Sequence, residues 1–196
     1  MKETILISII LIFIYIYFFL NKKKNLVSIE SYNGTKYMVY NDNLNKDKAN
    51  LLATIVKNMC ILKNYLVKNI DDKEFIEYKP YIKQLDKNFN ENRTSIYETD
   101  PNSNLTSYSV NKGEELSVCL KSKNDSKLHD INLLMYVIVH EMSHFACPEI
   151  GHGALFQKIF KKFIEVSIKL EIYSFKDYNN KPVEYCGMIL SSNVMD

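Results

Sequence analysis

Two histidines four residues apart flank a glutamate in the segment His140-Glu141-Met142-Ser143-His144. Side chains four residues apart lie one turn above each other on a helix, so both imidazoles can point at one metal ion. Glu141 stands beside the first histidine and can take a proton from a water activated by that ion without binding the ion itself. Zn²⁺ lowers the pKa of such a water to about 7 and polarises carbonyl groups. The spacing therefore predicts a zinc-dependent hydrolase.

The sequence around this motif predicts a buried helix. Residues 129–146 are apolar almost all round, with Asp130 placed to cap the helix and Pro148 placed to end it. Two imidazoles in such a helix are costly to bury unless they are hydrogen-bonded or bound to a metal. With four histidines in 196 residues, random placement would produce this motif about 0.005 times per chain. A metal site therefore explains the pair better than two core histidines do.

A catalytic zinc site needs a third protein ligand and one open coordination position. His152 is the first candidate, because the break after the helix lets the chain turn back toward the ion. Glu165 on the following helix is the rival ligand, and Glu149 is a weaker one. His129 would lie about 16 Å from His140 along the helix, so it cannot bind the same ion.

The segment HEMSHFACPEIGHGALF, residues 140–156, resembles the motif of the WLM and SprT-like zincin metallopeptidases. In those families the HExxH helix is followed by a third histidine in a glycine-containing turn, and an aromatic residue comes four positions later. Gly151, His152 and Phe156 occupy these places. The longer stretch from about residue 27 onward resembles uncharacterised WLM-type proteins of giant DNA viruses. The shared features are a short N-terminal hydrophobic anchor, the strand GEELSVCLKSK and the tail PVEYCGM.

This resemblance implies an α+β zincin fold in which His140, His144 and His152 bind one Zn²⁺ ion and Glu141 is the general base. The implied fold is a small sheet packed on the active-site helix and further helices.

Two finer roles follow from the same resemblance. Zincins bind substrate antiparallel to an edge strand that precedes the motif helix. Residues 116–121 alternate so that Leu116, Val118 and Leu120 share one face, and this strand is the expected substrate-binding strand. An ordinary strand of the sheet is the alternative interpretation. Tyr185 is expected to donate a hydrogen bond to the oxyanion, with simple packing of its ring as the alternative.

The remaining chain predicts a mixture of strands and helices. Asn33-Gly34 lies between two β-rich runs, residues 27–31 and 36–40, and predicts a hairpin. Apolar residues recur at helical spacing in two further segments. Other segments are β-prone, or too irregular for a regular element. The expected elements are helices at 49–69, 75–89 (weaker, interrupted by Pro80) and 156–173, β-prone pieces at 94–98 and 106–110, and an irregular tail from 174.

The N-terminus predicts a membrane anchor. Residues 5–20 contain no charge, no proline and no glycine, and as a helix they would span about 24 Å of a hydrocarbon core of about 30 Å. Lys22, Lys23 and Lys24 follow directly and place the rest of the chain on the cytosolic side by the positive-inside rule. A cleaved signal peptide is the alternative, but the segment lacks a small-residue cleavage site.

Charge and cysteine content limit the other classes of function. Without residues 1–24, the chain has 21 basic and 22 acidic residues, and Arg93 is its one arginine. Such a near-neutral surface argues against nucleic-acid binding. The four cysteines are widely spaced, which argues against a disulfide-stapled scaffold, and a cytosolic location predicts reduced thiols.

The sequence thus predicts two parts: a membrane anchor with a lysine-rich flank at residues 1–24, and a zincin-like metallopeptidase domain at residues 25–196. The expected protein is a single-pass, membrane-anchored and cytosol-facing zinc metallopeptidase acting on a protein or peptide substrate. A zinc-stabilised, non-catalytic membrane adaptor is the alternative.

Overall fold

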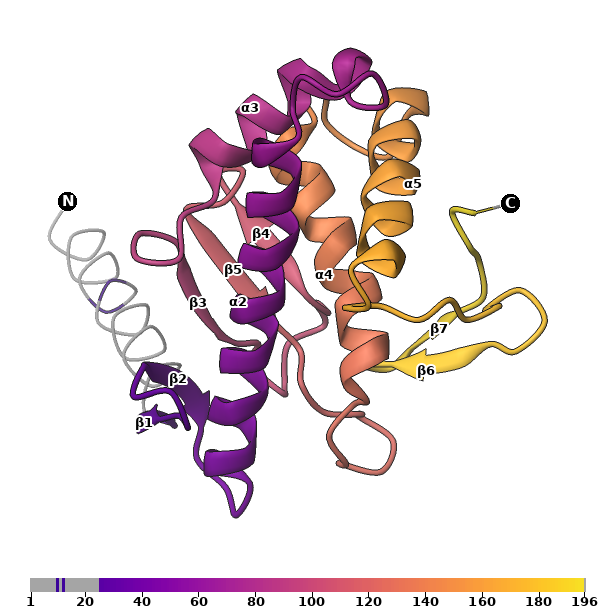
Figure 1. The fold of residues 1–196 in the computed structure, drawn as a ribbon. Coiled ribbons are helices and arrows are strands. Elements are labelled where there is room, and N and C mark those ends of the chain that lie inside the picture. The colour runs from indigo at the N-terminus through magenta and orange to yellow at the C-terminus, as the bar shows by residue number, and fades with distance from the viewer. Residues whose placement is uncertain (1–9, 11, 13–24, 196) are drawn as a thin grey trace, which may run out of the picture.

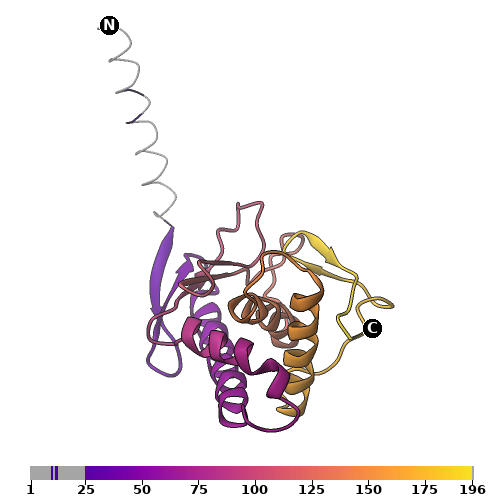
Figure 2. The ribbon, with the colours of Figure 1, turned by 90° about the horizontal axis from the view of Figure 1, so that it is seen from above.

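In the part of the chain that the structure describes, a five-stranded sheet carries the long helices on one of its sides (Figures 1 and 2). The computed structural model describes residues 10, 12 and 25–195. The predicted α+β class is confirmed. The strands are β1 (Leu26–Glu30), β2 (Lys36–Tyr40), β3 (Ser95–Glu98), β4 (Tyr108–Val110) and β5 (Glu115–Val118).

The order of the strands in the sheet is β1-β2-β3-β5-β4. β1 and β2 form the predicted antiparallel hairpin, with Gly34 at φ +83° in the turn. β3 runs parallel to both β2 and β5, and β4 is antiparallel to β5. β5 is therefore an interior strand. The short β4 forms the edge of the sheet.

The helices are α2 (Asn45–Lys68), the 3₁₀ turn η1 (Ile76–Tyr78), α3 (Lys79–Asn88), α4 (Ile131–Ala146) and α5 (Ala154–Lys169). Pro80 does not interrupt a helix: it lies in the first turn of α3, where a missing N–H costs little. α4 begins as predicted, because the Asp130 carboxylate accepts a hydrogen bond from the Asn132 N–H at 2.9 Å.

α4 lies at the centre of the helical layer and packs against α2, α3 and α5 (Figure 1). Eleven of its 16 residues are buried, which matches its apolar composition. The core is formed by α4, the inner faces of its neighbouring helices and the buried residues of β5. This packing fixes the helix that carries the motif.

A buried ion pair joins the sheet to α2. Lys48 on α2 is fully buried, and its Nζ lies 2.9 Å from Glu98 Oε2 at the end of β3 and 3.1 Å from Asp42 Oδ2. The same ammonium donates to the Tyr40 carbonyl, and Glu98 accepts from the Tyr40 N–H at 2.6 Å. Burial raises the pKa of Glu98, although Lys48 opposes this shift. The pair therefore needs both partners.

The predicted location in a membrane is wrong for the part of the chain that the structure describes. The predicted anchor at residues 5–20 lies outside the described residues apart from Ile10 and Ile12. In the remainder, every helix is too short or too polar to cross a bilayer. α2 is long enough but carries five lysines. α4 is apolar, but its 16 residues span only about 24 Å.

The predicted absence of disulfides is also wrong. Cys119, just after β5, is bonded to Cys186, 67 residues later in the sequence, with their Cα atoms 6.4 Å apart. Cys186 lies in the turn of a second hairpin formed by β6 (Val183–Tyr185) and β7 (Met188–Leu190), in the tail that was expected to be irregular. The spacing of two distant cysteines cannot reveal such a pairing, since it depends on tertiary contact.

Candidate metal centre

Three imidazole nitrogens meet at one point beside α4. His140 and His144 lie one turn apart on the helix, and their Nε2 atoms are 3.2 Å apart. The Nε2 atom of His152 lies 3.0 Å from that of His140 and 3.1 Å from that of His144. Tetrahedral ligands at Zn–N distances of 2.0–2.1 Å would be separated by about 3.3 Å. The three nitrogens therefore fit one zinc ion and leave a fourth position free for water or substrate.

The loop after α4 turns so that His152 lies beside His140 and His144. α4 ends at Ala146, and the next residue, Cys147, is extended. Gly151 has φ +85°, a conformation that favours glycine. Lys112, in the turn between β4 and β5, donates from Nζ to the carbonyls of Cys147 at 2.5 Å and Pro148 at 2.8 Å. These bonds tie the loop that carries His152 to the edge of the sheet.

Phe156 is the common packing partner of the three imidazoles. Its ring centroid lies 4.9 Å from that of His140, 4.3 Å from His144 and 4.8 Å from His152. The aromatic residue four positions after the third histidine thus limits the orientations of all three rings. The sequence spacing indicates an aromatic residue at position 156, but it does not reveal that its ring contacts all three imidazoles.

The protonation states of the histidines suit metal binding. Burial, followed by repulsion from the neighbouring histidines, lowers the pKa of His140 to about 3. Burial, together with His152 and Lys112, lowers the pKa of His144 to about 4. Both imidazoles are therefore neutral at physiological pH, and the neutral imidazole is the form that binds a metal.

Glu141 lines the same cleft as the three histidines and is hydrogen-bonded to Ser109 on the edge strand β4. Its carboxyl is buried, and this burial raises its pKa to about 7, while a hydrogen bond with Ser109 on β4 opposes the shift. A nearby cation would favour the carboxylate. Glu141 is therefore a buried group placed beside the site rather than a fourth ligand.

The histidines open onto a cleft of about 530 Å³. β4 and the turn after it form one wall, and the loop from Glu149 to His152 forms the other. Sequence reasoning missed the contribution of this strand: residues 106–110 were expected to be β-prone, but the strand that would pair with them could not be identified. The cleft is lined by Tyr108, Ser109, Asn111, Lys112, His140, Glu141, His144, Glu149, Ile150, Gly151 and His152.

The residues expected to bind substrate lie elsewhere. Leu116, Val118 and Leu120 are completely buried in the core. β5 also has a partner strand on each side, so it cannot take up an extended substrate. The edge strand next to the motif helix is β4.

Glu165, the rival third ligand, lies on the exposed side of α5. Its carboxylate accepts from Lys162 Nζ at 3.5 Å, and it is not among the residues that line the cleft. Glu149 does line the cleft, but its side chain is exposed, and it is not part of the group of side chains that could hold one metal ion. Of the ligands considered, the structure brings together His140, His144 and His152.

Tyr185 is buried. Its hydroxyl is 2.5 Å from Ser107 Oγ and donates to the Cys119 carbonyl at 3.2 Å. Burial raises its pKa. Tyr185 is not among the residues that line the cleft, and its hydroxyl contacts Ser107 and Cys119 instead.

We expect Lys112→Met to weaken zinc binding about 10- to 100-fold, the range found when a partner that orients a metal ligand is removed. The physical reason is that the loop carrying His152 loses the hydrogen bonds that Lys112 donates to its carbonyls. The measurement is a competition titration with a zinc chelator. Lys123→Met is the matched control, because Lys123 also donates to a loop carbonyl, that of Ser103 at 2.6 Å, but away from the cleft. Equal affinities for the two variants would contradict this role.

Fold and site together define an α+β protein with an HExxH helix and a converging triad of histidines at the edge of its sheet. The chain belongs to the family of the uncharacterised protein R325 of Acanthamoeba polyphaga mimivirus, to which it is 39% identical over 194 residues, covering 96% of this chain and 95% of that protein. The predicted resemblance to uncharacterised proteins of giant DNA viruses is thereby confirmed.

Further comparisons give shorter or weaker likenesses. The uncharacterised protein 136R of Invertebrate iridescent virus 6 is 33% identical over 84 residues, covering 42% of this chain and 47% of that protein. The crystal structure of Wss1 from Saccharomyces cerevisiae matches with a TM-score of 0.42 and 18% identity, covering 64% of this chain and 84% of that one. A likeness at this level carries no conclusion about function. No protein-family model matches the chain.

Proposed function

We propose that residues 25–196 form a zinc-dependent metallopeptidase domain that hydrolyses peptide bonds in a protein or peptide substrate. The observation that carries the proposal is the convergence of three Nε2 atoms within 3.2 Å of one another beside a buried glutamate, at the open end of a cleft. His140, His144 and His152 would hold one Zn²⁺ ion. The bound ion would supply Lewis acidity toward the scissile carbonyl and toward water.

Two residues of the chain would carry out and support the proton transfer. Glu141 would accept the proton of the attacking water and deliver it to the amine of the leaving group. Its carboxyl is suited to both steps, since burial already holds its pKa near neutrality. Ser109 would keep that carboxyl in place through the hydrogen bond from β4.

The edge of β4 would hold the substrate. β4 pairs with β5 on one side, and no strand in the described part of the chain pairs with its other side. An extended peptide added to this free side would run along the cleft past Glu141. Backbone hydrogen bonds would then position the peptide bond without a requirement for particular side chains.

The test is a comparison of zinc binding by His152→Ala and Glu165→Ala. We expect the oxidised wild-type protein to bind one zinc ion and His152→Ala to bind it at least about 100-fold more weakly, because one of three ligands is lost. Glu165→Ala should bind zinc as the wild type does. Elemental analysis and chelator competition provide the measurements. A protein that binds no zinc would overturn the proposal, and loss of zinc in Glu165→Ala would overturn the ligand set.

A further inference from the structure

A second cluster of reactive side chains lies away from the histidine triad. It consists of the Cys119–Cys186 disulfide and His129. The Nε2 atom of His129 lies 3.4 Å from Cys186 Sγ and accepts a hydrogen bond from the Cys186 N–H at 3.3 Å. His129 precedes α4 and is not part of it. The fold thus places an imidazole directly against one sulfur of a disulfide.

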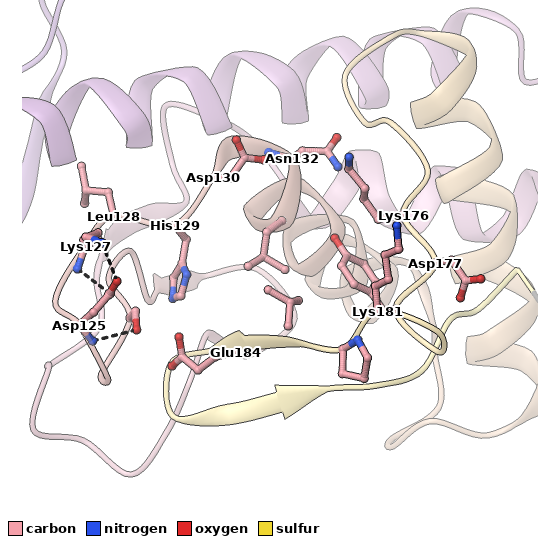
Figure 3. A pocket seen from close by; sticks show the side chains of 15 residues that line it. Asp125, Lys127, Leu128, His129, Asp130, Asn132, Lys176, Asp177, Lys181 and Glu184 are labelled. Carbon is pink, nitrogen blue, oxygen red and sulfur yellow. Dashed lines mark hydrogen bonds and ion pairs between the residues drawn. The ribbon is translucent and has the colours of Figure 1, made fainter.

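Each cysteine of the disulfide borders a hollow, although both residues are largely buried. Cys119 lines a hollow of about 230 Å³ together with Lys121 and Lys123, and Cys186 lines a separate hollow of about 470 Å³. His129 borders a third cavity, of about 570 Å³, where Figure 3 shows its ring pointing toward β6 and Glu184. Lys121 is paired with Asp42 at 2.8 Å, and Glu98 also lines the hollow beside Cys119. Lys123 is therefore the cation that would favour the approach of a thiolate.

We propose that Cys119–Cys186 is an exchangeable disulfide that a dithiol reductant opens in the folded protein. His129 accepts the proton of the Cys186 thiol when the disulfide forms again. The incoming thiolate would attack Cys119 Sγ from the lysine-lined hollow. The S–S bond breaks, a mixed disulfide forms on Cys119, and the electron pair leaves on Cys186 Sγ. The second thiol of the reductant then releases Cys119, so two electrons pass from the reductant to the protein and the reductant becomes a disulfide.

His129 acts when the bond closes again. The Nε2 atom of His129 accepts a hydrogen bond from the Cys186 N–H, so it carries no proton and can take one from the adjacent Sγ. Burial lowers the pKa of His129, which keeps the imidazole neutral, whereas Glu184 and Asp125 favour its protonated form. The proton would come from the Cys186 thiol, and the resulting thiolate attacks the mixed disulfide on Cys119 and expels the partner thiolate. Without this base, a smaller fraction of Cys186 would be ionised at neutral pH.

The disulfide is linked to the cleft through a short hydrogen-bonded chain. Cys119 N–H donates to Ser107 Oγ at 2.9 Å, and Ser107 Oγ also contacts the hydroxyl of Tyr185, the residue before Cys186. Ser107 directly precedes β4, the strand whose Ser109 contacts Glu141. Opening the disulfide would free the β6–β7 hairpin and loosen the edge strand. Its effect on cleavage rests on the proposed peptidase function, whereas the exchange itself does not.

The test uses the full-length protein in buffers of graded dithiothreitol and oxidised dithiothreitol, without denaturant. After an acid quench, thiols are alkylated in denaturant and assigned by mass spectrometry. We expect Cys119 and Cys186 to become alkylated together, while circular dichroism still reports the folded protein. Amide hydrogen exchange at residues 107–110 and 183–190 should rise at least about tenfold on reduction. The matched control is Cys60→Ser, which removes a free cysteine and should change neither result.

His129→Ala tests the role of the imidazole. We expect it to slow closure by oxidised dithiothreitol about tenfold at neutral pH, with the number of titrating thiols unchanged. The proposal is overturned if the disulfide opens only when the whole chain unfolds, or if reduction leaves the exchange of β4 unchanged. It is also overturned if the reduced protein takes up a second zinc ion that His129→Ala abolishes, because the cluster would then be a metal site. None of these measurements depends on peptide cleavage.

Discussion

Glu141→Gln should abolish most peptide cleavage, lowering the rate about 100- to 10,000-fold, the usual contribution of a general base. The amide has nearly the same shape as the carboxyl but cannot accept the proton of the attacking water. Zinc binding should remain, because Glu141 is not one of the three histidines proposed to bind the ion. The measurement is cleavage of an unfolded, fluorescently labelled protein, with zinc content determined on the same samples.

Glu165→Gln is the matched control, because it makes the same chemical change on the exposed face of α5. It should cleave at the wild-type rate. If Glu141→Gln retains full activity, the proposed general base is wrong. If the wild type binds one zinc ion but no substrate is cleaved in a Glu141-dependent manner, the site is structural rather than catalytic.

The acid limb of the pH profile should follow the ionisation of Glu141. Burial raises its pKa from 4.5 to about 7, and a bound cation acts in the opposite direction. A general base works only when deprotonated, so activity should fall as the pH drops through a midpoint between these two values. Zinc content measured over the same range separates this effect from protonation of the ligands. A pH-independent rate with zinc retained would contradict the assignment.

Lys48→Met should destabilise the fold by about 3–5 kcal/mol, the cost of leaving a buried charge without its partner. Glu98 is only 3% exposed and would lose its contact with the Lys48 ammonium. Urea denaturation gives the free energy of unfolding. The control is Lys158→Met, which breaks an exposed ion pair with Glu77 and should change stability little.

The same variant should show a distinctive pH dependence. A carboxyl whose pKa is raised in the folded state contributes stability when it is protonated, and that stability is lost as the pH rises. Removal of Lys48 would raise the pKa of Glu98 further, so the variant should be least stable near pH 7 and should approach the wild type in acid. Adding Glu98→Gln should restore part of the stability at neutral pH. A loss that is equal at all pH values would argue against an uncompensated charge.

The sequence predicts this fold best where information is local. The apolar run before His140, the cap at Asp130 and the turn at Gly34 each depend on neighbouring residues, and each is present in the structure. The spacing of His140, His144 and His152 likewise predicts a group of side chains that the structure brings together.

Long-range pairing could not be predicted in this way. The alternation in residues 116–120 identifies a strand, but it does not reveal that β3 and β4 cover both of its edges. The buried side chains of β5 are those of an interior strand, and the short, mixed sequence of β4 hides its position at the edge. The contact of His129 with Cys186 spans 57 residues, and no local pattern indicates it.

Under the proposed function, the shortness of β4 has a consequence for the choice of substrate. Three residues of strand offer about 10 Å of template, enough to align two or three residues of an added chain. Such a template recognises main chain and is nearly indifferent to sequence. The preference for one substrate protein over another would then depend on how readily a segment of that protein unfolds locally. A protein with this edge would select locally unfolded segments over folded ones. The selection would depend on how easily a segment unfolds and not on its amino-acid sequence.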